Sequence, residues 1–113
     1  LMCTQQQAVK ILNQVNEESS VIFGGVQDAY LYGSYARGDY TSESDIDILL
    51  TVNMNAASIA QHRNAVAAMT SRLSLENDIT VSVTVKPAAQ FRQYAQILPY
   101  YCNVLREGIR CAG

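Results

Sequence analysis

The sequence predicts one α/β domain, of the α+β kind, in which a small sheet is covered by helices, and it assigns all of residues 1–113 to that domain. Two observations carry this prediction. Apolar residues recur with helical spacing in three segments, and short apolar or alternating runs typical of strands lie between them. Glycine, proline and small polar residues mark the boundaries, and no repeat or low-complexity linker interrupts the chain. The expected order is helix, strand, short turn, strand, helix, strand and helix.

The first helix is expected over residues 5–19, where the apolar residues fall on one stripe: Ala8, Ile11, Leu12 and Val15. Thr4 followed by Gln7 has the pattern of a capping box at its start. A short extended piece at residues 21–23 is expected to precede the first strand, over residues 26–32.

A Gly-Ser turn follows that strand. Gly33 permits a positive φ or a close approach of the backbone to a ligand, and Ser34 supplies a hydroxyl. The N–H groups that follow open a helical turn expected over residues 35–38, an arrangement that favours phosphate. Arg37 in this turn either contacts the phosphate or forms a surface salt bridge with an acid of the polar loop at residues 39–44, and the sequence leaves both open.

The second strand, expected over residues 45–52, begins with two carboxylates. Asp45 and Asp47 point the same way because side chains alternate along a strand, and their Cα atoms are about 6.6 Å apart. Ile46 and Ile48 point into the core. Two parallel carboxylates repel each other unless a cation lies between them, and oxygen ligands favour Mg²⁺ or Mn²⁺. The turn and the carboxylate pair together predict a nucleoside triphosphate bound with Mg²⁺.

A long helix capped by Asn53 or Asn55 is expected to run to about residue 75, with the single histidine, His62, packed in its inward stripe. The third strand is expected over residues 77–85. One face of it is polar and either meets solvent or lines the site: Asp78, Thr80, Ser82 and Thr84.

The final helix is expected to start at residues 86–87, because proline suits the first helical turn. Pro99 should kink or break it, and Gly108 should end it and leave a short tail. Tyr100 and Tyr101 are consecutive, so at least one of them should be exposed or meet another chain.

Composition argues against several classes of function. The formal net charge is -2 and the 8 Lys and Arg residues form no basic run, so we expect no stable binding to nucleic acid by this chain alone. No run of about eighteen apolar residues and no signal peptide are present, so no membrane association is expected. The 3 cysteines are an odd number without metal-ligand spacing, which indicates a reduced, cytoplasmic setting.

Gly33-Ser34, a ten-residue gap and Asp45-Ile46-Asp47 resemble the signature of the DNA-polymerase-β-like nucleotidyltransferase superfamily. The full stretch over residues 33–50, GSYARGDYTSESDIDILL, resembles the bacterial minimal nucleotidyltransferases in particular. The match is sharp there and loose elsewhere. The resemblance implies a nucleotidyltransferase fold with a small mixed sheet. It also implies transfer of a nucleoside monophosphate, AMP in our interpretation, from ATP or another NTP to a hydroxyl, with release of pyrophosphate.

The resemblance further implies a metal site. Asp45 and Asp47 would hold two Mg²⁺ ions, about 3.5–4 Å apart, with Mn²⁺ as a substitute. The family uses a third carboxylate on a neighbouring strand, and Asp78 is the acid available on the expected third strand. Asp78 would then hold the catalytic metal and help to deprotonate the acceptor. The alternative is that Ser82 occupies this third position.

In the phosphate site that the family implies, Gly33 and Ser34 would bind the β- and γ-phosphates, with Arg37 assisting. Larger relatives carry an added domain that binds the base and the acceptor. Here we expect the acceptor on another protein or on a second copy of the chain, so a homo-oligomer is possible, and we expect the surface near Pro99 to contact that partner.

Many minimal nucleotidyltransferases pair with a small helical toxin of the HEPN type, and some attach AMP to a tyrosine on it. The leading interpretation is therefore an antitoxin that modifies such a partner. The alternatives are a non-catalytic nucleotide-binding or binding-only antitoxin module, and a small-molecule nucleotidyltransferase similar to those that act on aminoglycosides.

Overall fold

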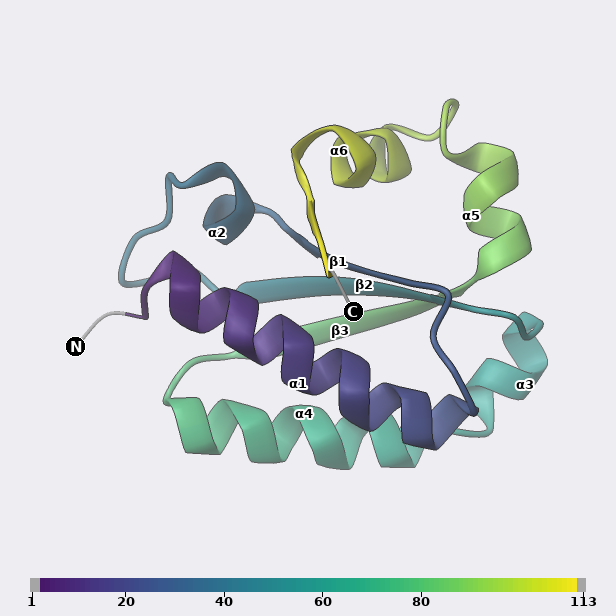
Figure 1. Cartoon of the computed structure of the whole chain (residues 1–113), viewed down its shortest axis with the longest axis horizontal. Coiled ribbons are helices and arrows are strands. Elements are labelled where there is room, and N and C mark those ends of the chain that lie inside the picture. The colour runs from purple at the N-terminus through teal and green to yellow at the C-terminus, as the bar shows by residue number, and fades with distance from the viewer. Residues whose placement is uncertain (1–2, 112–113) are drawn as a thin grey trace.

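The computed structural model describes residues 3–111, and its centre is a four-stranded sheet in the order β3-β2-β1-β4 (Figure 1). β1 (Asp28–Tyr32) is antiparallel to β2 (Ile46–Val52), and β2 is parallel to β3 (Val81–Pro87). β4 (Ile109–Arg110) is antiparallel to β1 on its other side. The expected small mixed sheet is therefore confirmed.

α1 (Gln5–Phe23) begins with the predicted capping box. The Thr4 hydroxyl accepts from the Gln7 amide at 3.2 Å, and the Thr4 amide donates to the Gln7 side chain at 2.7 Å. The prediction of an extended piece at residues 21–23 is wrong. The helix continues because Phe23 extends its buried stripe by one more turn.

The long helix expected after β2 is two helices, α3 (Ala56–Ala60) and α4 (Arg63–Asn77). Asn55 caps α3, which was one of the two predicted caps. The break lies at His62, whose ring packs edge-to-face on Phe23 with the ring centroids 5.1 Å apart. This packing role for the histidine agrees with the sequence prediction, but a straight helix through residue 62 is wrong.

Pro99 breaks the C-terminal helical segment as predicted, into α5 (Ala88–Tyr94) and α6 (Pro99–Glu107). Gly108 ends α6. The sequence analysis expected a short tail after it and did not predict a strand there, whereas the chain returns to the sheet as β4. There the Arg110 side chain donates to Asp28 of β1 at 2.6 Å.

Helices cover both faces of the sheet (Figure 1). α1 and α4 pack on one face with Ile46, Ile48 and Leu50 of β2. α5 and α6 pack on the other face, where the buried residues are Tyr30, Leu49, Phe91, Ala95, Tyr101 and Val104. Since side chains alternate along β2, the face of Leu49 is also the face of Asp47.

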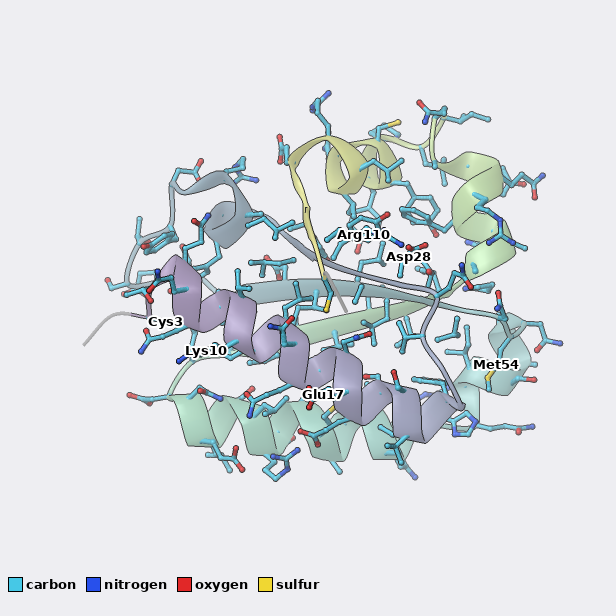
Figure 2. All side chains as sticks on the ribbon, in the orientation of Figure 1. Cys3, Lys10, Glu17, Asp28, Met54 and Arg110 are labelled. Carbon is cyan, nitrogen blue, oxygen red and sulfur yellow. The ribbon has the colours of Figure 1, made fainter. Side chains whose placement is uncertain are left out.

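The longest helix in the described part of the chain is α1, with 19 residues. It buries one stripe and leaves a polar face on which Lys10 and Glu17 are exposed (Figure 2). No helix within residues 3–111 has the length and apolar character that a bilayer crossing requires.

Candidate active site

The Gly-Ser turn packs directly against a carboxylate of β2. Gly33 has φ 76° and ψ -154°, which L side chains rarely adopt, and α2 (Ser34–Arg37) begins immediately after it. A Cβ atom built on Gly33 would lie 2.8 Å from Oδ2 of Asp47. The Ala36 and Arg37 amides donate to the Gly33 carbonyl, so among the described residues the Ser34 and Tyr35 amides are the ones of α2 that remain available at this point. The turn and the carboxylate therefore belong to one site.

Asp47 is the centre of a row of side chains that crosses the sheet. In the strand register it lies directly opposite Tyr32 of β1 and opposite Ser82 of β3. Paired residues of neighbouring strands share a face, so all three side chains lie on the α5–α6 side. Asp45 comes just before β2 and is exposed, whereas Asp47 is half-buried.

The two carboxylates affect each other electrostatically. Burial raises the pKa of the Asp47 carboxyl above its ordinary value, and the negative charge of Asp45 raises this pKa further. The positive charge of Arg37 lowers it. The site therefore concentrates negative charge that a bound cation would neutralise.

Arg37 is engaged by two other acids. Its Nε donates to Asp39 at 3.1 Å, and its Nη1 donates to Glu107 of α6 at 3.3 Å. The predicted salt bridge with an acid of the loop is therefore present, and Glu107 was not predicted. Contact between Arg37 and a phosphate stays a prediction.

Asp78 does not lie on the third strand, and the prediction that placed it there is wrong. β3 begins at Val81, and Asp78 is the C-terminal cap of α4, with φ 52°. Aspartate tolerates this left-handed conformation, which ends a helix before the chain turns into the strand. Asp78 and Asp45 line one depression of about 500 Å³.

The three predicted carboxylates do not form one cluster. Among residues 3–111 no three His, Cys, Asp or Glu side chains gather closely enough to hold a metal ion. The side chain that lies beside Asp47 on β3 is Ser82, the alternative that the sequence left open. Ser82 offers a neutral hydroxyl oxygen where a third carboxylate was expected.

The sequence analysis missed a pair of tyrosines beside Asp47. The hydroxyls of Tyr32 and Tyr100 share a hydrogen bond of 2.8 Å that ties β1 to α6. Burial raises the pKa of Tyr32, and the bond to Tyr100 and the charge of Asp47 raise it further, so its hydroxyl stays protonated. Tyr32 adjoins the Gly-Ser turn in sequence, but nothing in the sequence pairs it with a residue 68 positions away.

These features define the class of the protein. A mixed sheet presents a glycine turn at the end of one strand and carboxylates at the start of the next, which suits a phosphate chain bound with a divalent cation. This is the architecture of a nucleotide-dependent transferase. The family model for the nucleotidyltransferase domain matches residues 9–102, and the chain belongs to this family.

A curated relative supports the same reaction. "Putative protein adenylyltransferase MJ0604" of Methanocaldococcus jannaschii is 33% identical over 94 residues, which are 83% of this chain and 86% of that protein. With the family match, this similarity identifies the chain as a nucleotidyltransferase similar to protein adenylyltransferases.

Solved structures share the fold. The protein named "putative nucleotidyltransferase" from Sulfolobus solfataricus is 26% identical with a TM-score of 0.55, over 94% of this chain and 80% of that one. A second match is the complex of a tri-AMPylated HEPN toxin with MNT antitoxin from Shewanella oneidensis. It is 19% identical with a TM-score of 0.56, over 97% of this chain and 73% of that one. At this identity, the second likeness shows the fold alone.

Proposed function

We propose that the chain transfers AMP from ATP, with Mg²⁺, to a hydroxyl on a partner protein of the HEPN type and so acts as an antitoxin. The name of the curated relative supports a protein acceptor. The shared fold with an antitoxin whose toxin partner carries AMP supports the kind of partner.

The observation that carries this proposal is the contact between Gly33 and Asp47. The turn that we propose binds phosphate packs directly against the carboxylate that we propose binds the metal, because a Cβ atom on Gly33 would lie 2.8 Å from Oδ2 of Asp47. A triphosphate held at the turn would therefore present its phosphates to Asp45 and Asp47. A plain structural turn would not need a carboxylate at this place, because burying charge without a partner is unfavourable.

The residues present fit a divalent cation. Asp45 and Asp47 supply oxygen donors and negative charge, which Arg37 offsets in part while it is held by Asp39 and Glu107. Mg²⁺ is commonly bound by one or two carboxylates together with substrate phosphates, so two carboxylates are sufficient. When bound, Mg²⁺ polarises the phosphoryl oxygens and stabilises the charge that develops during transfer.

The chain's own groups then bind and orient the substrates. The amides after Gly33 and the Ser34 hydroxyl would donate hydrogen bonds to the β- and γ-phosphates. The acceptor oxygen forms a bond to the α-phosphorus, the bond from that phosphorus to the bridging oxygen breaks, and pyrophosphate leaves while the hydroxyl proton passes to solvent. Tyr32 stays protonated, so its hydroxyl would not serve as the base.

The test combines the purified chain, the product of the adjacent gene, ATP and Mg²⁺, followed by intact-mass measurement. We expect a mass increase on the neighbour equal to one AMP or a multiple of it. Asp47→Asn should abolish the increase, whereas Glu17→Gln, an exposed acid on α1, should leave it unchanged. A stable complex whose components keep their masses would contradict transfer and favour a binding-only antitoxin.

A further inference from the structure

A groove of about 620 Å³ runs along β3, between this strand and the helices α3, α4 and α5. Val83 and Val85 of β3 and Ile59 and Val66 of the helices give it an apolar lining. α3 and α5 lie beyond the end at which β2 and β3 finish, on the right of Figure 1. The groove also reaches back along β3 to Val81 and Ser82, which lie near the proposed nucleotide site at the start of these strands.

Within the described residues β3 is an edge strand, because it pairs with β2 on one side alone. The Ile46 amide of β2 donates to the Thr80 carbonyl, so in this parallel ladder the even-numbered residues of β3 turn their backbone groups toward β2. Val83 and Val85 turn their backbone N–H and C=O groups away from β2, toward the open edge of the sheet. Within residues 3–111 the amides of these two valines have no hydrogen-bond partner outside the ladder. The edge can therefore pair with another extended segment.

The groove is positively charged, although the whole chain has a net charge of -2. Within residues 3–111 four of the 8 Lys and Arg side chains make ion pairs, and none of these four lines the groove. Arg63 and Lys86 line the groove, and Arg92 lines an adjoining hollow. None of these three side chains forms an ion pair with another described residue. In the described part of the chain no Asp or Glu lines either depression.

The groove is continuous with the site of transfer through Ser82. This residue lines the groove and is also the direct neighbour of Asp47 in the sheet. Strands are spaced by about 4.8 Å, so a residue paired beside Ser82 would lie about 10 Å from Asp47, backbone to backbone. A long side chain on the same face could cover that distance. Lys86 lies four residues beyond Ser82 on β3, so their Cα atoms are about 13 Å apart.

We propose that the open edge of β3 binds an extended, acidic segment of the acceptor protein and brings its hydroxyl-bearing residue beside Ser82. The proposal rests on the proposed function, because it assumes a protein acceptor. Backbone pairing would hold the segment to Val83 and Val85, and carboxylates of the segment would pair with Arg63 and Lys86.

Other occupants fit less well. Nucleic acid would need more clustered cations and aromatic side chains for stacking, and the groove lining contains no aromatic residue. A second copy paired about a two-fold axis would bring Arg63 and Lys86 close to the same residues of the other copy, where like charges repel.

The test uses labelled heptapeptides of alternating valine and threonine, with a tyrosine at one end and three glutamates toward the other, made in both sequence orders. Fluorescence anisotropy without ATP or Mg²⁺ measures their dissociation constants. We expect binding that weakens with salt, and about tenfold weaker binding when lysines replace the glutamates. N-methylation of the peptide amides that face β3 should also weaken binding severalfold.

Variants locate the site. Arg63→Gln with Lys86→Gln should weaken binding of the acidic peptide about tenfold, equivalent to roughly 1.4 kcal/mol. Lys10→Gln is the matched control, because Lys10 is exposed on α1 without an ion pair in the described residues, and it should bind as the parent does.

Equal binding of the acidic and lysine peptides, or no effect of N-methylation, would overturn the proposal. So would a dimer in sedimentation experiments that the peptide disrupts. The peptide-binding assay does not depend on AMP transfer. If the peptide binds as expected but the chain transfers no AMP to the partner protein, the result counts against the proposed function alone. AMP transfer to the partner that proceeds equally well in the Arg63→Gln, Lys86→Gln variant counts against the groove alone.

Discussion

Gly33 and Asp47 are packed so closely that a Cβ atom at position 33 would stand 2.8 Å from Oδ2 of the aspartate. Real Cβ atoms essentially never come this near to another heavy atom. The glycine therefore keeps free the space that the carboxylate occupies, besides supplying the backbone conformation of the turn. The two halves of the sequence signature hold each other in position before any ligand binds.

Gly33→Ala should displace the Asp47 carboxylate and abolish Mg²⁺-dependent binding of ATP, and Gly33→Val should do so as well. The strained backbone should lower the free energy of unfolding by about 1–3 kcal/mol. Calorimetric titration with ATP and Mg²⁺ measures the first effect, and urea unfolding measures the second.

Gly24→Ala is the control for this experiment. Its φ of 73° is close to that of Gly33, but a Cβ atom there would meet nothing within 4 Å. We expect lower stability with unchanged nucleotide binding. If Gly33→Ala bound ATP as well as Gly24→Ala does, the phosphate site would lie elsewhere.

Asp47→Asn should stabilise the metal-free protein at pH 7. The folded protein raises the pKa of Asp47 above the ordinary 3.8, so folding favours the protonated acid. Stability is then lost as the pH rises from the ordinary pKa through the raised one, and a neutral amide avoids this loss. Thermal melting in EDTA should show a higher Tm for the variant at pH 7 and a smaller difference below pH 3. Mg²⁺ with ATP should stabilise the parent alone. A lower Tm for the variant in EDTA at pH 7 would contradict the electrostatic account.

Ser82→Asp should increase affinity for Mg²⁺ or Mn²⁺, because it places a third carboxylate beside Asp47 on the neighbouring strand. We expect a gain of about tenfold, or roughly 1.4 kcal/mol. Asp78→Asn should change this affinity little, since Asp78 caps α4 rather than joining β3. Binding of Mn²⁺, followed by electron paramagnetic resonance, distinguishes the two positions. Asp45→Asn is the comparison for Asp78→Asn. If the two variants lowered the affinity for Mn²⁺ equally, Asp78 would be the third metal ligand.

Tyr32→Phe and Tyr100→Phe should each destabilise the protein by about 0.5–1.5 kcal/mol, the range of one hydrogen bond. The double variant should cost little more than either single one, because both changes remove the same bond. Urea unfolding of the four proteins completes the cycle. Additive losses would show that the two hydroxyls act independently.

The sequence predicted the parts of the fold that depend on local chemistry. The capping box at Thr4, the helix break at Pro99 and the burial of Ile46 and Ile48 all follow from the types and positions of these residues. The mixed sheet came from the resemblance to a family. The sequence motif already grouped Gly33 with Asp47. Their direct contact is visible only in the structure.

The remaining features depend on contacts between distant segments. Two-residue β4 has too little sequence to show a strand pattern, and its pairing with β1 is visible only in three dimensions. Asp78 was misplaced because alternation of polar and apolar residues continues from residue 78 into β3, while the helix before it ends two positions later than expected. At the break between α3 and α4, the His62 ring packs on Phe23 of another helix, a contact that the sequence alone does not show.

The pairing of β4 with β1 also has a consequence for synthesis. Leu31 and Ile109 are partners in the sheet, yet translation at about 5–20 residues per second needs roughly 4–16 s to pass from one to the other. Throughout that interval the nascent chain leaves the outer side of β1 unpaired. Ribosomes that stall before residue 109 would release a protein with this side of the sheet still open, a substrate for proteases and chaperones rather than a finished domain.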